Sequence, residues 1–150
     1  MNSTAPRKLQ NIIILDANFI LLPFQFKIDF FEDITFKLEG SKRFIVFKQI
    51  FDELEAKKNR EKDATKFQQQ LSAGIEYLNQ RKDKYDLLII DKIKALNETT
   101  DDFLITQSLE FQDQCKHLYL ATNDSELRRK AKKSNINVIF LRQKKYLCFE

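Results

Sequence analysis

The chain has 150 residues, enough for one domain and too few for two of ordinary size, and its 43% hydrophobic and 32% charged residues suit a globular fold with a buried core. It contains only 2 glycines and 2 prolines, where average usage gives roughly ten and roughly seven, which argues against a turn-rich sandwich or barrel, a collagen-like repeat or a flexible linker. The net charge of +4 is modest, so the position of the basic residues matters more than their excess.

Short apolar runs recur along the chain and predict buried strands. Between them lie charged stretches in which apolar residues return every three or four positions, the spacing of an amphipathic helix. In chain order the predicted elements are a strand over 11–15, a helix over 28–38, a strand over 43–47, helices over 48–58 and 63–80, a strand over 87–90, a helix over 101–114, a strand over 117–121, a helix over 125–134 and a strand over 137–141.

This alternation predicts an α/β fold with a mostly parallel, doubly wound sheet of five strands. We expect residues 1–10 to form an N-terminal tail and residues 11–150 to form one domain. No apolar run approaches the roughly 18 residues of a membrane-spanning helix, and the first ten residues lack the apolar stretch of a secretory signal. Cys115 and Cys148 lack metal-ligand spacing, which favours reduced thiols in a soluble, cytoplasmic protein without a membrane partner.

Acidic residues follow the ends of the predicted strands. Asp16 comes directly after the first strand, and Asp124 lies shortly after the fourth. Glu53 lies in the helix that follows the second strand, and Asp101 with Asp102 opens the helix after the third. Open parallel sheets bind ligands at the carboxyl ends of their strands, where the strand order reverses. We therefore expect these carboxylates to meet at one edge of the sheet.

Each carboxylate also has a purely structural interpretation. Asp101, Asp102 and Asp124 stand at helix starts, where aspartate caps backbone N–H groups and complements the helix dipole. Glu53 has acidic neighbours and fits a solvated helix face. Asp16 differs, because a carboxylate that enters a half-buried edge after four apolar residues is costly unless it is paired. A cation held between the clustered carboxylates would solve this problem for all of them.

The predicted cluster offers only oxygen ligands, without His or Cys at ligand spacing. Such a set suits Mg²⁺ or Mn²⁺ better than Zn²⁺. One or two of these ions can bind a phosphodiester, lower the pKa of a bound water and stabilise the leaving oxygen. The residues therefore indicate metal-assisted phosphoester chemistry.

The same motifs resemble those of the PIN-domain nucleases. Leu-Asp-Ala-Asn contains Asp16, Phe-Asp-Glu-Leu-Glu contains Glu53, Thr-Asp-Asp-Phe-Leu-Ile contains Asp101, and Thr-Asn-Asp contains Asp124. The resemblance spans residues 12–146 and implies a single PIN-like, three-layer α/β/α domain. It also implies that these four carboxylates ligate one or two Mg²⁺ or Mn²⁺ ions and catalyse endonucleolytic cleavage of single-stranded RNA. The neighbours expected to support these ligands are Asn18, Asp102, Thr122 and Asn123.

Two segments are similar to an archaeal branch of the family that resembles ribosomal-RNA-processing PIN proteins. They are residues 22–26 and the tail over residues 125–147, in which Gln143 replaces the expected glycine. This similarity implies an endoribonuclease that acts on rRNA precursors. Some family members have lost activity and act as scaffolds, whereas this chain keeps all four acidic positions.

Basic residues gather after Asp124, and Glu126 is the sole acid between positions 125 and 148. On the predicted helix they stand one turn apart and flank its apolar stripe. A basic face beside an acidic cleft would hold RNA phosphates in a salt-sensitive way, and Tyr146 could stack a base. The alternative is that these cations only aid solubility. The residues expected to bind RNA are Arg128, Arg129, Lys132, Lys133, Arg142, Lys144, Lys145 and Tyr146.

Other functions share some of these features. A phosphatase of the haloacid-dehalogenase type needs Asp-x-Asp after its first strand, but Asn18 stands at the second position. A catalytically silent RNA-binding adaptor and the toxin ribonuclease of a toxin–antitoxin pair stay open as alternatives, and the toxin would have an antitoxin as its partner.

Residues 57–66 mix charges and favour a solvated loop and helix start. The residues that belong either to the core or to a homodimer surface are Phe24, Phe26, Phe30 and Phe31.

Overall fold

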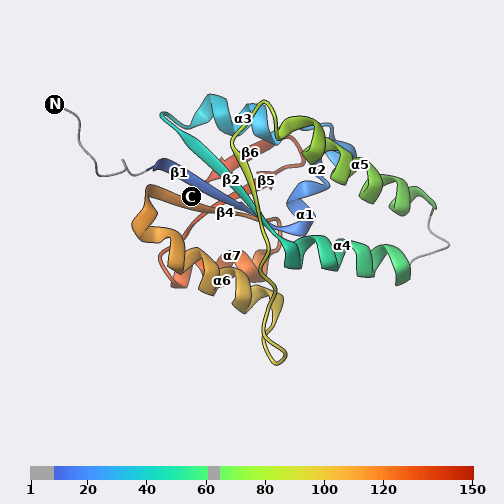
Figure 1. Cartoon of the computed structure of the whole chain (residues 1–150). Coiled ribbons are helices and arrows are strands. Elements are labelled where there is room, and N and C mark those ends of the chain that lie inside the picture. The colour runs from blue at the N-terminus through green and yellow to red at the C-terminus, as the bar shows by residue number, and fades with distance from the viewer. Residues whose placement is uncertain (1–8, 61–64) are drawn as a thin grey trace.

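The computed structural model describes residues 9–60 and 65–150, and these form six strands, seven α-helices and one 3₁₀ turn (Figure 1). The strands are β1 (Leu9–Leu15), β2 (Lys42–Phe47), β3 (Leu87–Ile90), β4 (Cys115–Ala121), β5 (Asn137–Arg142) and β6 (Tyr146–Phe149). The helices are α1 (Ala17–Ile20), α2 (Leu22–Phe26), α3 (Phe30–Lys37), α4 (Lys48–Arg60), α5 (Thr65–Arg81), α6 (Thr100–Phe111) and α7 (Ser125–Lys133), and the 3₁₀ turn η1 is Gln112–Gln114.

All six strands belong to one sheet with the order β3-β2-β1-β4-β5-β6. The first five are parallel, and β6 runs antiparallel to β5. The chain adds β2 and β3 on one side of β1 and then returns to add β4 and β5 on the other, so the strand order reverses between β1 and β4. Leu15 pairs with Ala121, so the residues that follow them leave the sheet side by side. This is the position at which open α/β sheets bind ligands.

The predicted α/β class and its mostly parallel sheet are confirmed. All five predicted strands occur, and β3 has the predicted bounds. β1 begins at Leu9, so residues 9 and 10 belong to the sheet rather than to the tail, while residues 1–8 lie outside the described residues. The predicted start of a helix at residue 63 also lies outside them, and α5 is described from Thr65.

The sheet has a sixth strand that the sequence pattern did not predict. β6 is not a continuous branched apolar run like the four residues of β3, and it forms because the chain turns back on β5. Gln143 and Lys144 adopt the left-handed backbone region in this turn, with φ of 55° and 58°. Such conformations match the twist of a β-hairpin and favour glycine. Gln143 therefore adopts a positive φ without the conformational freedom of glycine.

The segment between β1 and α3 forms two short helices that we did not predict. Asp16 precedes α1 and accepts the backbone N–H of Ala17 at 2.8 Å. Pro23 lies in the first turn of α2, where its missing N–H costs no hydrogen bond. Lys27 then ends α2 in the left-handed region. These helices are too short for a periodic apolar pattern; the Asp16 cap favours α1, and Pro23 and the left-handed Lys27 set the bounds of α2.

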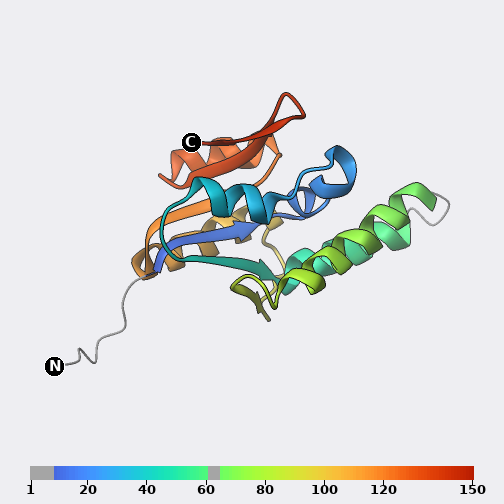
Figure 2. The same cartoon turned by 90° about the horizontal axis from the view of Figure 1, so that it is seen from above.

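Helices cover both faces of the sheet. In Figure 1, α3 and α5 lie above it, and α6 and α7 lie below it. α6 packs on β4, α7 packs on β5, and the two helices contact each other. Figure 2 shows α4 and α5 side by side, projecting beyond the sheet. In the described parts of the chain, no helix has the length and apolar character needed to cross a membrane.

The phenylalanines after β1 divide between core and surface. Phe30 and Phe31 are fully buried, and their rings stack with centroids 4.7 Å apart. Tyr77 of α5 packs on Phe30 at 5.2 Å, so this aromatic cluster joins α3 to α5. Phe26 is half-buried, and Phe24 is exposed with one edge against Tyr77. The core interpretation therefore holds for Phe30 and Phe31.

Candidate metal centre and active site

Asp16 follows β1 directly, and its carboxylate is buried at the end of the strand. Its backbone N–H donates to the carbonyl oxygen of Ala121 at 3.0 Å, which extends the pairing of β1 with β4 by one residue. Oδ1 accepts the N–H of Ala17 at 2.8 Å, and Oδ2 accepts the hydroxyl of Thr122 at 2.7 Å. The carboxylate is thus held in one orientation from both sides.

Residues after β4 complete this arrangement. Thr122 is fully buried, and its Oγ1 accepts the N–H of Asp124 at 3.1 Å while it donates to Asp16. Asn18 Oδ1 accepts the N–H of Asn123 at 2.9 Å. Asn123 Oδ1 in turn accepts a backbone N–H of β5 at 2.9 Å. Side chains of a single Thr-Asn-Asp step therefore bind the ends of three adjacent strands together.

Asp124 is the N-cap of α7. Its Oδ1 accepts the N–H of Glu126 at 2.9 Å and that of Leu127 at 3.3 Å. The structural interpretation of this aspartate therefore holds, but it does not exclude a second role. Capping uses Oδ1, and the carboxylate also lines the cavity described below.

Asp101 lies in the first turn of α6 and is not its cap. Thr99 takes that role, because its Oγ1 accepts the N–H of Asp102 at 3.1 Å. Burial raises the pKa of Asp101, and the carboxylate of Asp124 raises it further. Lys130 Nζ lies 4.0 Å from Asp101 Oδ2 and 3.9 Å from Asp102 Oδ1, and it moderates this repulsion. The capping interpretation is therefore wrong for Asp101.

Glu53 lies on α4, one residue before the buried Leu54. The hydroxyl of Thr100, the first residue of α6, donates to Glu53 Oε1. This bond links two helices that follow different strands and turns Glu53 toward the sheet edge. Glu53 is half-buried, so it does not belong to a freely solvated helix face.

The four predicted carboxylates line one cavity of about 680 Å³. Two of them follow β1 and β4, and the other two lie on α4 and α6, so four separate chain segments supply the cluster. Of the four neighbours expected to support the ligands, Asn18 lines the cavity as well, Thr122 and Asn123 act through the hydrogen bonds above, and Asp102 is exposed. The cavity carboxylates are Asp16, Glu53, Asp101 and Asp124.

The donor set of the cavity fits a hard divalent cation. Its ligand candidates are carboxylate oxygens, which Mg²⁺ and Mn²⁺ prefer. Within residues 9–60 and 65–150, no three or more His, Cys, Asp or Glu side chains lie as close together as the ligands of a bound ion. The carboxylates therefore line the same cavity, but their oxygens do not converge on a single point.

The raised pKa of the Asp16 carboxyl is also consistent with a cation site in the cavity. Burial raises its pKa to about 6, although the hydrogen bonds from Thr122 and Ala17 act in the opposite direction. The nearby carboxylates of Asp101 and Glu53 raise the pKa further. A cation beside these oxygens would favour the ionised form, because opposite charges within a few ångströms lower a carboxyl pKa.

Comparison with known proteins decides the family. A family model described as a PIN-like domain matches residues 13–144, which is most of the chain. The chain belongs to the PIN-domain nuclease family. The predicted family is thereby confirmed. This PIN domain is also 29% identical over 137 residues to Ribonuclease VapC4 of Methanocaldococcus jannaschii, and the match covers 89% of this chain and 92% of that protein.

Solved structures show the same fold. The PIN domain endonuclease Utp24 aligns with a TM-score of 0.64 at 21% identity, over 93% of this chain and 90% of that chain. A domain of a functionally unknown protein from Methanocaldococcus jannaschii aligns with a TM-score of 0.60 at 17% identity, over 91% and 92%. PIN-domain nucleases are RNA-cleaving hydrolases and generally use divalent metal ions.

Three basic residues of this PIN domain line the acidic cavity, and sequence reasoning missed all three. Lys57 and Arg60 lie on the last turns of α4, in a stretch that we interpreted as solvated. Lys94 lies after β3, where its N–H donates to Oε1 of the buried Gln49 at 3.1 Å. The available signal was the position of Glu53, because Lys57 follows it by one helical turn.

Two of the predicted RNA-binding residues on α7, Arg128 and Lys132, contact the sheet or the residue that follows it, and a third, Arg129, pairs with Glu126 of the same helix at 3.9 Å. The guanidinium of Arg128 lies 4.0 Å from the centre of the Phe140 ring, and Arg128 is half-buried. Lys132 forms an ion pair with Glu150 near the end of β6. Both side chains therefore contribute to the attachment of α7 to the sheet.

The remaining predicted RNA-binding residues lie on surfaces outside the acidic cavity. Arg129 and Lys133 are exposed and line a shallow basic hollow of about 450 Å³ along α7. The other four lie on the β5–β6 hairpin, where Lys145 and Tyr146 share a hollow with α3. The residues of this hairpin group are Arg142, Lys144, Lys145 and Tyr146.

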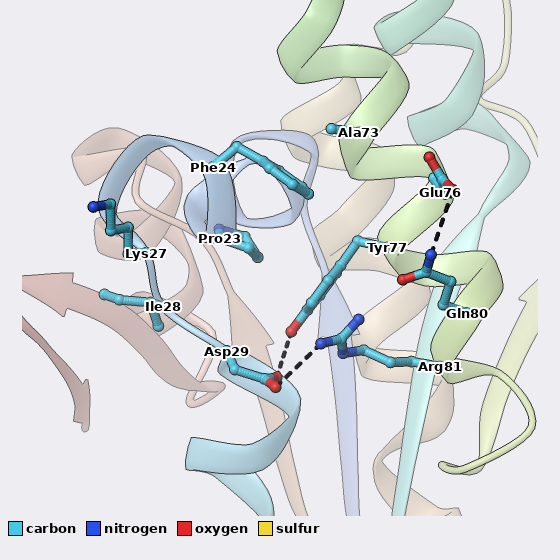
Figure 3. A pocket seen from close by; sticks show the side chains of 10 residues that line it. All are labelled: Pro23, Phe24, Lys27, Ile28, Asp29, Ala73, Glu76, Tyr77, Gln80 and Arg81. Carbon is cyan, nitrogen blue, oxygen red and sulfur yellow. Dashed lines mark hydrogen bonds and ion pairs between the residues drawn. The ribbon is translucent and has the colours of Figure 1, made fainter.

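A second cavity, of about 490 Å³, lies between α2 and α5 (Figure 3). Asp29 accepts the hydroxyl of Tyr77 at 2.5 Å and pairs with Arg81 at 3.3 Å. The Arg81 guanidinium also lies 3.7 Å from the centre of the Tyr77 ring. Burial raises the pKa of the Tyr77 hydroxyl, and its bond to Asp29 raises it further. These groups satisfy one another, which identifies the cluster as a structural link between α3 and α5.

Proposed function

We propose that this PIN domain is a metal-dependent endoribonuclease that cleaves single-stranded RNA. One observation supports the proposal most directly: Asp16, Glu53, Asp101 and Asp124, supplied by four segments, line a single cavity at the point where the strand order reverses. We assign these four residues as ion ligands and catalytic groups, with one or two Mg²⁺ or Mn²⁺ ions as the cofactor.

Bound ions of this kind would lower the pKa of a water, bind the scissile phosphate and stabilise the leaving oxygen. The chain supplies the orientation of their ligands. Thr122 fixes Oδ2 of Asp16, and Thr100 positions Glu53. Lys130, close to Asp101, supplies a positive charge at the edge of the carboxylate cluster.

We further propose that basic residues beside the cavity hold the RNA backbone. Lys57, Arg60 and Lys94 line the cavity itself, so they are placed to contact the phosphates next to the scissile bond. Arg129 and Lys133 extend the positive surface along α7, which begins immediately after Asp124. Phosphate contacts of this type position a strand without reading its sequence. We assign weaker, peripheral contacts to Arg142, Lys144, Lys145 and Tyr146.

We place this activity in the processing of rRNA precursors in the cytoplasm. The similarity of residues 22–26 and 125–147 to archaeal processing proteins supports the role, and both cysteines are free thiols, as a reducing compartment allows. The alternative role is the toxin of a toxin–antitoxin pair. The similarity of nearly the whole chain to Ribonuclease VapC4 supports this role equally. A small antitoxin gene directly upstream would favour the toxin role over rRNA processing.

The test uses the purified chain and an end-labelled, unstructured RNA. We expect internal cleavage in Mn²⁺ or Mg²⁺, no cleavage in EDTA, and none by the Asp16→Asn variant. Products should carry 5′-phosphate ends. A wild-type protein that binds the RNA but leaves it intact with either ion would instead identify a silent RNA-binding adaptor and contradict the proposal.

A further inference from the structure

Exposed apolar side chains concentrate at one edge of the molecule. Half of the large hydrophobic residues that are exposed in the described parts of the chain lie between positions 88 and 96, on β3 or in the segment that follows it. Their exposed fractions are 41% for Leu88, 48% for Ile89, 58% for Ile93 and 100% for Leu96. Exposed apolar residues gathered in one segment are a common feature of interaction sites in soluble domains.

The backbone of β3 is unpaired along the same edge. β3 ends the sheet order, and no other strand among residues 9–60 and 65–150 pairs with its outer side. The N–H of Phe44 donates to the carbonyl oxygen of Asp86 at 2.8 Å, within a register that pairs Phe44 with Leu87. In a parallel ladder this directs the backbone groups of Leu88 to β2 and those of Leu87 and Ile89 outward.

Edge strands in stable proteins are usually protected by charge, by proline or by a covering element. β6, at the other edge, packs against α3 and follows Lys144 and Lys145. β3 contains neither a charge nor a proline, because its four residues are Leu-Leu-Ile-Ile. Asp86 and Asp91 flank it, but no second strand in the described parts of the chain covers its outer side. An uncovered edge of this composition would template aggregation, so a partner strand is the expected cover.

We propose that β3 pairs antiparallel with β3 of a second copy of this chain, with Ile89 opposite Ile89 at the two-fold axis. The two sheets then continue into each other. A two-fold interface uses the same patch on both copies, and an uninterrupted apolar strand is complementary to itself. None of residues 86–92 lines the acidic cavity, so the dimer and the proposed nuclease activity are independent.

The positions of the outward backbone groups and the flanking charges select this register. Because the groups of Leu87 and Ile89 face outward, only odd-numbered residues of the two copies can form hydrogen-bonded pairs. Placing Ile89 opposite Ile89 sets Leu88 opposite Ile90 and brings Asp86 toward Lys92 of the second copy. This register sets Asp91 opposite Leu87, so the flanking charges select it through Asp86 and Lys92 alone. A shift of the second strand by two residues in either direction separates this pair: one shift sets Lys92 against Leu88, and the other sets Asp86 against Ile90.

Charges beside the strand complement each other in the selected register. Asp86 already pairs with Arg43 at 3.1 Å, and Lys92 pairs with Glu110 at 3.6 Å. These side chains are between 39% and 56% exposed, which leaves each of them accessible to a second partner. Pairing would place charges of alternating sign in the order Arg43, Asp86, Lys92 and Glu110 across each end of the interface. Opposite charges across strands stabilise pairing, and like charges oppose it.

The first test measures mass in solution as a function of protein concentration. We expect wild type to be a dimer at micromolar concentration and Ile89→Lys to weaken association about 100-fold, because two lysines then face each other in an apolar ladder. Phe36→Lys is the matched control, since Phe36 is 87% exposed on α3, and it should remain dimeric. Circular dichroism verifies that each variant is folded. A monomeric wild type, or a folded Ile89→Lys that still forms the wild-type dimer, would overturn the proposal.

The second test uses introduced cysteines, so it does not require that the Ile89→Lys variant folds. Directly opposite residues of a hydrogen-bonded pair have Cα atoms about 5.5 Å apart, which a disulfide can span. In a Cys148→Ser background, Ile89→Cys should form a disulfide-linked dimer under mild oxidation. Leu87→Cys, which would lie opposite Asp91 of the second copy, should not. Equal cross-linking of both variants, or none by either, contradicts the proposed register.

Discussion

Thr122 Oγ1 donates a hydrogen bond of 2.7 Å to Oδ2 of Asp16, although the two residues are 106 positions apart in the chain. The parallel pairing of β1 with β4 brings them together, because Leu15 lies opposite Ala121 at the last step of the ladder. The bond holds the most buried carboxylate of the cavity and lowers its pKa against the effect of burial.

We therefore expect Thr122→Val to destabilise the protein. The substitution keeps the shape but leaves a buried carboxylate oxygen without its donor, which costs about 1–3 kcal/mol of unfolding free energy. It should also raise the pKa of Asp16 further. Urea denaturation with and without EDTA measures the first effect, and Thr122→Ser, which keeps the hydroxyl, is the control. Equal stability of the valine and serine variants would contradict this role.

Asp16→Asn should abolish cleavage and leave the fold intact. Burial opposes the charge of Asp16, so the neutral amide removes an ion ligand without removing a stabilising charge. Calorimetric titration with Mn²⁺ should show weaker binding, and circular dichroism should match wild type. Asp102→Asn is the control, because Asp102 is exposed beside the cluster and should cost less activity. Cleavage at the wild-type rate by Asp16→Asn would refute the ion assignment.

Asp124 allows the two roles of one carboxylate to be separated. Asparagine is as good an N-cap as aspartate, so Asp124→Asn should keep the unfolding free energy within a few tenths of a kcal/mol and still abolish cleavage. Asp124→Ala should in addition lose about 1 kcal/mol, because the N–H groups of Glu126 and Leu127 lose their acceptor. Cleavage assays and urea denaturation of both variants distinguish ligand from cap. An active asparagine variant would reduce Asp124 to a cap.

Lys130 competes with a metal ion for Asp101. Its Nζ lies 4.0 Å from the carboxylate in a partly exposed pair, and such pairs contribute about 0.2–1 kcal/mol. Lys130→Gln should therefore tighten Mn²⁺ binding by roughly 1.5- to 5-fold, measured by paramagnetic resonance of the free ion. Lys116→Gln, an exposed lysine on β4, should leave the affinity unchanged. Weaker Mn²⁺ binding by the Lys130 variant would show that Lys130 does not oppose the ion.

Arg129 and Lys133 provide the clearest test of the basic face, because Arg128 and Lys132 are engaged with Phe140 and Glu150. Arg129→Gln combined with Lys133→Gln should weaken RNA binding. For single strands each lost phosphate contact reduces the slope of log affinity against log salt by about 0.7, so the pair should reduce it by about 1.4.

Fluorescence anisotropy at several salt concentrations measures this slope. Arg128→Gln should instead lower thermal stability, because its guanidinium packs on Phe140. An unchanged salt slope in the double variant would assign the basic face of α7 to solubility alone.

The link between α3 and α5 predicts a pH dependence of stability. Burial would raise the pKa of Asp29, but hydrogen bonds from Tyr77, the Glu32 N–H and Arg81 outweigh it, so the pKa is lower than in the unfolded chain. The ionised form therefore stabilises the fold above the unfolded value of about 3.9, and this contribution disappears as the pH falls through the lower folded value.

Urea denaturation between neutral and acidic pH measures the contribution of Asp29. Asp29→Asn should flatten the acid side of the stability curve, and Tyr77→Phe should shift its fall toward higher pH. Asp113→Asn, an exposed change on η1, should leave the curve unchanged. Identical curves for wild type and Asp29→Asn would contradict the assignment.

Much of this molecule follows from its sequence, because burial on both faces of a parallel sheet imposes continuous apolar runs. The runs at 11–15 and 87–90 identify strands, and the acids placed after them identify a candidate site at the sheet edge. The short helices α1 and α2 and the strand β6 lack a periodic pattern, since capping, a left-handed turn and pairing with β5 determine them.

Only the tertiary structure decided which of two local roles each polar residue takes. Asp101 is a member of the carboxylate cavity because Thr99 takes the capping position, and Arg128 is a packing residue because Phe140 lies beneath it. Lys57 and Arg60 are exposed, as the mixed charges of their stretch predicted, but they also line the cavity. Sequence spacing predicts which residues share a helix face. The strand order determines which other element that face packs against. That order is a long-range property of the folded chain.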